Sequence, residues 1–134
     1  MNSRKIILAV LIVVIIIIVY VSTNNSPQLS LNVDVISSGD DLTITINNRS
    51  WNTIYFGQKY EIQRYTNNEW ETIYIPDGWE DIAYSLKPRK KFEQVILFVP
   101  SEPGQYRILK EVFSDLSDEE TAKIIIAEFT VSKQ

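Results

Sequence analysis

The sequence predicts an all-β domain, an antiparallel β-sandwich, preceded by one N-terminal transmembrane helix. An unbroken apolar run near the N-terminus predicts the helix. The remaining chain alternates apolar and polar residues in short segments, and turn-forming residues separate these segments. No amphipathic helical period follows the apolar run, so we expect strands in two facing sheets and one domain.

The apolar run covers Ile6 to Val21 and contains no charged residue. As a helix these residues rise about 24 Å, a little less than the roughly 30 Å thickness of the hydrocarbon layer. Lys5 at one end and Ser22 and Thr23 at the other can make up the difference. Insertion is favourable by several kcal/mol, about −0.3 to −0.6 kcal/mol for each Leu, Ile or Val near the helix centre. Residues 6–21 are therefore predicted to be a transmembrane signal-anchor.

A cleaved secretory signal is the alternative interpretation, because it also combines a basic start with an apolar stretch. Cleavage requires small residues at two positions spaced like Ala-x-Ala. Tyr20 is too large to pair with Ser22, and Val21 with Thr23 is a weak match. The sequence therefore favours an uncleaved anchor, and cleavage would release a secreted domain.

Arg4 and Lys5 precede the apolar run, and no charge follows it until Asp34. The positive-inside rule then places the N-terminus in the cytoplasm and the C-terminal domain outside the cell. We expect a cytoplasmic tip at 1–5, the helix at 6–21, a polar spacer at 22–28 and the domain at 29–134. The spacer reaches at most about 25 Å, so the domain stays close to the cell membrane.

Composition excludes several functions of the outer part. Without Arg4 and Lys5, 11 basic and 17 acidic side chains remain, a formal charge of −6, which disfavours nucleic acid as a partner. The chain has no cysteine and no histidine, so disulfides, thiol nucleophiles and Ser-His catalysis are excluded, and the commonest transition-metal ligand is missing. We expect neither an enzyme nor a cofactor.

Alternation first appears at Leu29–Val35 and resumes at Leu42–Ile46, around a turn at Gly39. These segments are predicted to be two half-buried antiparallel strands. Seven further strands are predicted at Thr53–Phe56, Tyr60–Tyr65, Trp70–Ile75, Ile82–Leu86, Phe92–Val99, Gln105–Val112 and Ala122–Val131.

The most specific local motif is Pro103-Gly104-Gln105-Tyr106-Arg107-Ile108. A tyrosine near the start of a late strand, after a Gly-containing corner, has the form of a tyrosine corner, in which the hydroxyl bonds to the backbone a few residues upstream. An ordinary half-buried strand tyrosine is the other interpretation. We also predict structural roles for three other residues. Gly57 is expected at a turn, and Trp70 and Tyr60 in or near the core.

Several motifs follow one another in a characteristic order along the domain: Ile46-Asn47-Asn48-Arg49-Ser50, Ile54 to Ile62, the Trp70 hairpin, Gly104 to Lys110 and Ala127-Glu128-Phe129-Thr130-Val131. Their order resembles the bacterial Ig-like domains of exported proteins in Bacillus-type Gram-positive bacteria. The resemblance covers about Leu29 to Val131 and implies an immunoglobulin-like β-sandwich at a cell envelope, with no catalytic residues to transfer.

Five residues are candidates for ligand binding. Trp79 lies in a polar loop, and with Trp51 and Tyr84 it offers an amphipathic ring that can stack on a sugar or fill a protein pocket. Lys90 and Lys91 belong to the one concentrated basic patch and can meet an anionic polymer or a lipid headgroup. The simpler interpretation of these residues is a packed aromatic and a solvated hairpin.

Acidic residues do not form a convincing site. The run of carboxylates between residues 115 and 120 lacks the glycine and regular spacing of a calcium loop. The adjacent Glu80 and Asp81 would point to opposite faces of a strand. The sequence therefore predicts a membrane-anchored extracellular binding module with an envelope protein as partner. The alternative is a domain that binds cell-wall glycan or an anionic polymer.

Overall fold

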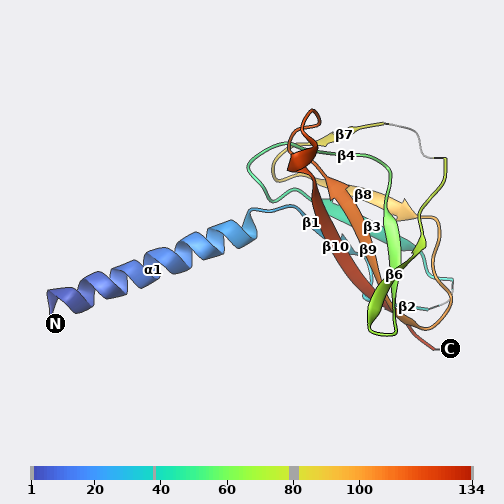
Figure 1. Cartoon of the computed structure of the whole chain (residues 1–134), viewed down its shortest axis with the longest axis horizontal. Coiled ribbons are helices and arrows are strands. Elements are labelled where there is room, and N and C mark those ends of the chain that lie inside the picture. Colours follow the sequence, from blue (N-terminus) through green and yellow to red (C-terminus); the bar gives the residue numbers. More distant parts are fainter. Residues whose placement is uncertain (1, 38, 79–81, 134) are drawn as a thin grey trace.

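The computed structural model describes residues 2–37, 39–78 and 82–133. It begins with helix α1 (Ser3–Asn24), which extends away from the rest of the molecule (Figure 1). Its segment Ser3–Ser22 has a mean hydropathy of 3.1, and none of it is buried against the protein. The helix is therefore long and apolar enough to cross a membrane, and none of the described residues of the domain covers its apolar segment.

Strands form the remainder of the structure. One antiparallel sheet has the order β1-β3-β8, and a second has the order β2-β10-β9-β5-β6. A short pair, β4 and β7, extends the second sheet through a bridge between Tyr55 and Phe113. The bounds are β1 (Gln28–Leu31), β2 (Val35–Ile36), β3 (Leu42–Asn47), β4 (Ile54–Phe56), β5 (Glu61–Thr66), β6 (Glu69–Tyr74), β7 (Tyr84–Leu86), β8 (Lys91–Ile96), β9 (Gly104–Val112) and β10 (Lys123–Val131), with a 3-10 turn, η1 (Glu119–Thr121), before β10.

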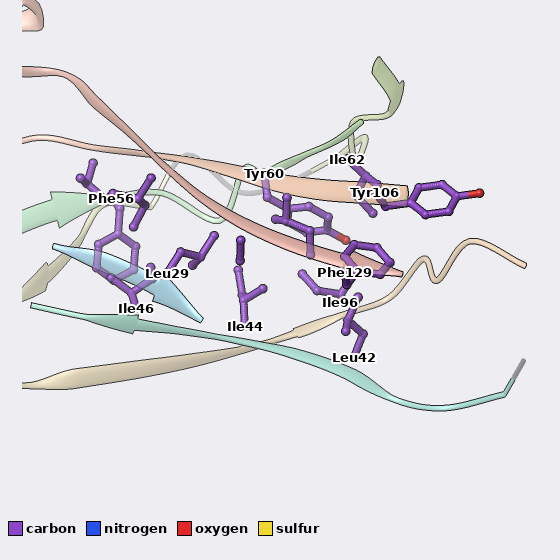
Figure 2. Close-up of a cluster of buried hydrophobic side chains, with 14 of the residues drawn as sticks. Leu29, Leu42, Ile44, Ile46, Phe56, Tyr60, Ile62, Ile96, Tyr106 and Phe129 are labelled. Carbon is purple, nitrogen blue, oxygen red and sulfur yellow. The ribbon is translucent and has the colours of Figure 1, made fainter. Parts of the chain in front are cut away.

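The core lies between the two larger sheets. Ile44 and Ile46 on β3 are fully buried, as are Ile62 on β5 and Ile108 on β9. Figure 2 shows the side chains of β3 directed toward the opposite sheet, where Tyr60 and Phe129 lie. Strict alternation of buried and less buried residues along β3 and β9 produces this arrangement, since successive strand residues point to opposite faces. The predicted all-β sandwich behind one helix is confirmed.

One predicted strand is divided in the structure. The segment predicted as Leu29–Val35 contains β1, which pairs antiparallel with β3, and the start of β2, which pairs in parallel with β10 in the other sheet. Asn32 ends the first ladder, because its side-chain oxygen accepts a hydrogen bond from the Thr43 amide at 2.9 Å. Its amide group also donates to the carbonyl of Asp41. The chain then crosses to β10, where the Thr130 amide donates to Asp34.

The later strands begin and end within three residues of their predicted bounds. The hairpin between β5 and β6 shows how the sequence sets such a boundary. Asn67 and Asn68 have φ angles of 52° and 65°, the left-handed pair that a two-residue type I′ turn requires. Asparagine tolerates this region better than most residues, so the Asn-Asn pair supports a tight turn.

Tyr106 has the geometry of a tyrosine corner. The side chain is buried, and its hydroxyl donates a hydrogen bond of 2.7 Å to the carbonyl of Glu102. Its ring stacks on Phe129 with 5.4 Å between centroids. At Gly104 an added Cβ would lie 3.3 Å from Nε of Arg64, so a larger residue would displace the Arg64 side chain. The corner thus joins the turn before β9 to the core.

Trp70 is half-buried and lies outside the core, unlike Tyr60, which is buried. Trp70 pairs with Tyr65, and their ring centroids are 5.1 Å apart. Arg107 covers the Trp70 ring at 4.4 Å. Register explains the position, because Tyr65 is three residues beyond the inward-facing Ile62 and therefore points to the outer face.

Candidate functional site

The direction of the strands brings two loops to the end of the domain where α1 enters. Gln28, at the start of β1, pairs with Asn47, and Asn47 pairs with Lys91. The loop after β3 (48–53) and the loop before β8 (87–90) therefore lie beside the chain segment that leaves the helix, as Figure 1 also shows. We call these two loops, with Lys91 and the connecting segment 25–27, the anchor-proximal tip.

Asn48 holds the two loops together from inside. Its side chain is fully buried, and its amide donates hydrogen bonds to the carbonyls of Asn52 and Leu86 at 2.8 and 2.9 Å. Its side-chain oxygen accepts bonds from the amide and hydroxyl of Ser50. The backbone of Asn48 also bonds to the other loop: its N–H donates to the carbonyl of Lys90, and its carbonyl accepts from the amide of Arg89. A buried amide satisfied in this way fixes the relative position of the loops.

Arg89 takes a conformation that favours glycine. Its φ is 65°, and it follows Pro88 in a turn closed by the Lys90 amide donating to the carbonyl of Lys87. Proline followed by a positive φ is the pattern of a type II turn, in which glycine or asparagine is preferred at the second central position. For another L-residue this conformation costs about 1–2 kcal/mol. The arginine side chain is therefore present despite a local cost in stability.

The side chain of Arg89 joins the tip to the helix end. Its guanidinium lies 4.3 Å from the ring centroid of Trp51, in a cation–π contact. One guanidinium nitrogen donates a 3.0 Å hydrogen bond to the side-chain oxygen of Asn25, the C-cap of α1. Trp51 nevertheless remains 69% exposed. Two loops distant in sequence thus present an exposed indole and a cation together.

The structure brings three of the five candidate residues to this tip. Trp51 lies in the loop after β3, and Lys90 and Lys91 are exposed at the end of the other loop and the start of β8. Tyr84 lies apart from them: its ring packs on Phe56 and Phe92, and its hydroxyl accepts a bond from Gln58. Trp79 lies outside the described residues.

An acidic loop lies at the same end, between β9 and β10. Asp115 accepts hydrogen bonds from the amide and hydroxyl of Ser117, which lower the pKa of its carboxyl group. Asp118 accepts a bond from the amide of Glu120 and so caps η1. In the described part of the chain, no three acidic side chains converge in a group that could hold a metal ion. These carboxylates stabilise their own loop.

Lys110 is a buried ionisable residue that was not among the candidates predicted from the sequence. It is on the inner face of β9 and only 1% exposed. Its ammonium donates to the carbonyl of Gly57 at 2.6 Å and to the side-chain oxygen of Gln94 at 2.8 Å. Burial lowers the pKa of Lys110 to about 8. One feature of the sequence could have identified Lys110 as buried: it occupies an inward-facing position of the strand, between Ile108 and Val112. Both partners lie far away in the sequence.

The side of the sandwich opposite β1 and β2 exposes apolar side chains. Here β6 and β8 are the edge strands of their sheets, and Phe98, just after β8, stacks on Tyr74 of β6 at 4.4 Å. Leu97 is 88% exposed beside them. We call this the open side; its exposed apolar residues are Ile73, Ile75, Val95, Leu97 and Phe98.

A family model described as a bacterial Ig-like domain matches residues 23–130, which is most of the chain. The chain belongs to the bacterial Ig-like domain family. The two sheets, the crossing of the first strand between them and the tyrosine corner are the features of this Ig-like domain described above.

Solved structures that resemble the Ig-like domain are distant from it. A DNA-bound alkylpurine DNA glycosylase from Pseudomonas fluorescens has a TM-score of 0.42 and 15% identity over 81% of this chain and 31% of its own. The CARDB domain of a Pyrococcus furiosus protein has a TM-score of 0.41 and 16% identity over 80% of this chain and 86% of its own. A β-glucosidase mutant from Listeria innocua has a TM-score of 0.34 and 16% identity over 81% of this chain and 16% of its own. The chain thus spans less than a third of the glycosylase and less than a fifth of the glucosidase. No curated protein matches the chain.

Proposed function

We propose that this protein is a single-pass membrane protein that holds one Ig-like domain outside the cell and acts by binding an envelope protein. The observation that carries the proposal is the uncovered apolar helix Ser3–Ser22, followed after a few residues by a folded domain. A soluble protein would leave this large apolar surface in water, at a cost of roughly 25 cal/mol for each Å². A bilayer removes that cost.

The direction of insertion follows from charge. Arg4 and Lys5 precede the apolar part, so the positive-inside rule keeps residues 1–5 in the cytoplasm and sends 29–134 outside. In this proposal residues 6–21 form the anchor and 22–28 join it to the domain; of these, 22–24 continue α1 and Gln28 begins β1. The domain then operates next to its own membrane, where other membrane proteins are the nearest partners.

The open side is the surface that we assign to a protein partner. Exposed Leu97, next to Phe98 and close to Val95 along the chain, is the kind of apolar side chain found at the centre of a protein interface. The neighbouring edges of β6 and β8 also carry backbone groups that a strand of another protein can pair with. Catalysis has no part in the proposal, since the chain lacks both imidazole and thiol.

Topology is tested with single cysteines, because the chain contains none of its own. Ser101→Cys, exposed on the domain, should react in intact cells with a maleimide reagent that cannot cross membranes, while Ser3→Cys should react only after permeabilisation. The full-length chain should remain in the membrane fraction. A soluble product, or a protected Ser101→Cys, would contradict the anchor, and a mature product that starts after Val21 would show cleavage instead.

Binding is tested by a photo-crosslinking amino acid at Leu97 in intact cells, with Gln105, exposed on a different strand, as the matched control position. We expect one adduct of discrete mass from Leu97 and none from Gln105. Val95→Glu places a charge in the open side and should abolish the adduct. Equal labelling from both positions, or an adduct that survives Val95→Glu, would reject the open side as the binding surface.

A further inference from the structure

The anchor-proximal tip is held at a defined depth relative to the helix. The apolar part of α1 ends at Val21, and Asn25 is four residues further along, about 6 Å at the rise of an α-helix. Each headgroup layer of a bilayer is about 5–8 Å thick. The Arg89 guanidinium donates a 3.0 Å hydrogen bond to the Asn25 side chain. If the helix spans the membrane, this guanidinium therefore lies among the lipid headgroups.

The tip carries the side chains that this layer favours. Trp51 is exposed, and tryptophan is enriched at membrane interfaces, where its ring is apolar and its N–H can bond to water or lipid. Lys87, Lys90 and Lys91 are exposed around Arg89, which makes this loop strongly basic in an otherwise acidic domain. Arginine at the positive-φ position of the turn, where glycine is preferred, adds one more cation at a cost in local stability.

We propose that the anchor-proximal tip binds the anionic lipid headgroups of the membrane that its own helix crosses, and so holds the Ig-like domain in one orientation on the bilayer. The inference rests on the proposed membrane anchoring. Phosphate groups of the lipids bind Arg89 and the neighbouring lysines, and Trp51 inserts at the interface. Because the acidic loop at the same end is repelled by anionic lipid, docking favours the rotation of the domain that turns the basic tip, and not this loop, toward the bilayer.

The test uses the full-length chain in lipid nanodiscs, either purely phosphatidylcholine or with about a third phosphatidylglycerol. A fluorophore is attached to Asn52→Cys, next to Trp51, or to Asn67→Cys in the hairpin turn at the far end of β5. Lipids with a spin label on the headgroup quench fluorophores close to the surface. Anionic discs should increase quenching at position 52 and leave position 67 unchanged, and 0.5 M salt should reverse the increase because it screens the charges.

Variants separate the tip from the rest of the domain. Arg89→Gly keeps a residue suited to the positive φ and removes the cation, and Lys90→Gln removes a second charge. Each should lower the equilibrium constant for docking about five-fold. Lys133→Gln is the matched control, because it removes an exposed lysine beyond β10 and should have no effect. Glu119→Gln with Glu120→Gln should increase docking, since it reduces repulsion by the acidic loop.

Two failures remain distinguishable. A chain that does not stay in the discs would overturn the membrane anchor and the proposed function with it. A chain that is inserted, but whose label at position 52 is quenched equally in both lipids and in Arg89→Gly, would overturn the docking alone.

Discussion

The buried Lys110 should make the domain more stable as the pH rises from 7 to 9.5. In the folded protein, burial lowers the pKa of the Lys110 ammonium to about 8, from an ordinary value of 10.5. Between these two values the unfolded chain holds a proton that the folded chain has released. The unfolded state therefore binds more protons in this interval, and the free energy of unfolding increases with pH.

The size of the effect follows from the two pKa values. Each pKa unit corresponds to 1.36 kcal/mol, so complete removal of the buried charge is worth about 3 kcal/mol. At pH 9.5 about 2 kcal/mol of this is gained. Above pH 10 the gain is opposed, because burial raises the pKa values of Tyr60 and Tyr106 and the unfolded chain loses these protons first. The experiment therefore ends at pH 9.5.

Urea unfolding of the full-length protein in detergent micelles measures this free energy. The three tryptophans all lie beyond the helix, so their fluorescence reports the domain alone. Lys110→Met should give the same free energy at pH 7 and 9.5, and Lys123→Met, which changes an exposed lysine, should keep the rise. Constant stability in the unmodified protein, or a rise that persists in Lys110→Met, would refute the assignment of the effect to Lys110.

The same unfolding assay tests three other contacts. Tyr106→Phe should lower the free energy of unfolding by about 0.5–1.5 kcal/mol through loss of the corner hydrogen bond, whereas Tyr65→Phe, on the exposed face, should not change it. If Tyr106→Phe were as stable as the unmodified protein, the corner hydrogen bond would contribute nothing to stability. Asn48→Ala should cost about 2–4 kcal/mol because the buried carbonyl of Leu86 and the partly buried carbonyl of Asn52 lose their donor, and a cost below 1 kcal/mol would show that water replaces the amide. Asn68→Gly should add about 0.5 kcal/mol by relieving the positive φ, whereas a loss would argue against a type I′ turn.

Local patterns in the sequence were sufficient for most of the fold. The pattern of apolar residues predicted the strands that became β3 and β9, and the structure buries Ile44, Ile46 and Ile108 on them because a strand in a sandwich has one face in the core. The hairpin turn at Asn67 and Asn68 lies between two of the predicted strands, where turn-forming residues separate them. Each of these signals is contained within about ten residues, so a single sequence is enough to show it.

Features that depend on distant partners were not predictable in this way. The crossing from β1 to β2 depends on Asn32 bonding to Thr43, and nothing in the alternation of Leu29–Val35 indicates it. The contact between Trp51 and Arg89 joins two loops 38 positions apart, so the sequence offered an aromatic candidate and a basic patch with no reason to connect them. Lys110 likewise finds its acceptors at Gly57, just after β4, and at Gln94 on β8.

Asn48 links the stability of the fold to the arrangement of the anchor-proximal tip. The same residue that fills a buried position at the end of β3 bonds through its backbone to Arg89 and Lys90, and through its side chain to the carbonyl that ends β7. The positive φ of Arg89 is unfavourable in isolation, so the turn needs these bonds to hold it. A side chain in the core thereby determines where the exposed cation lies. For this reason the tip should keep its geometry whether or not lipid is bound, and docking would require no prior ordering of the two loops.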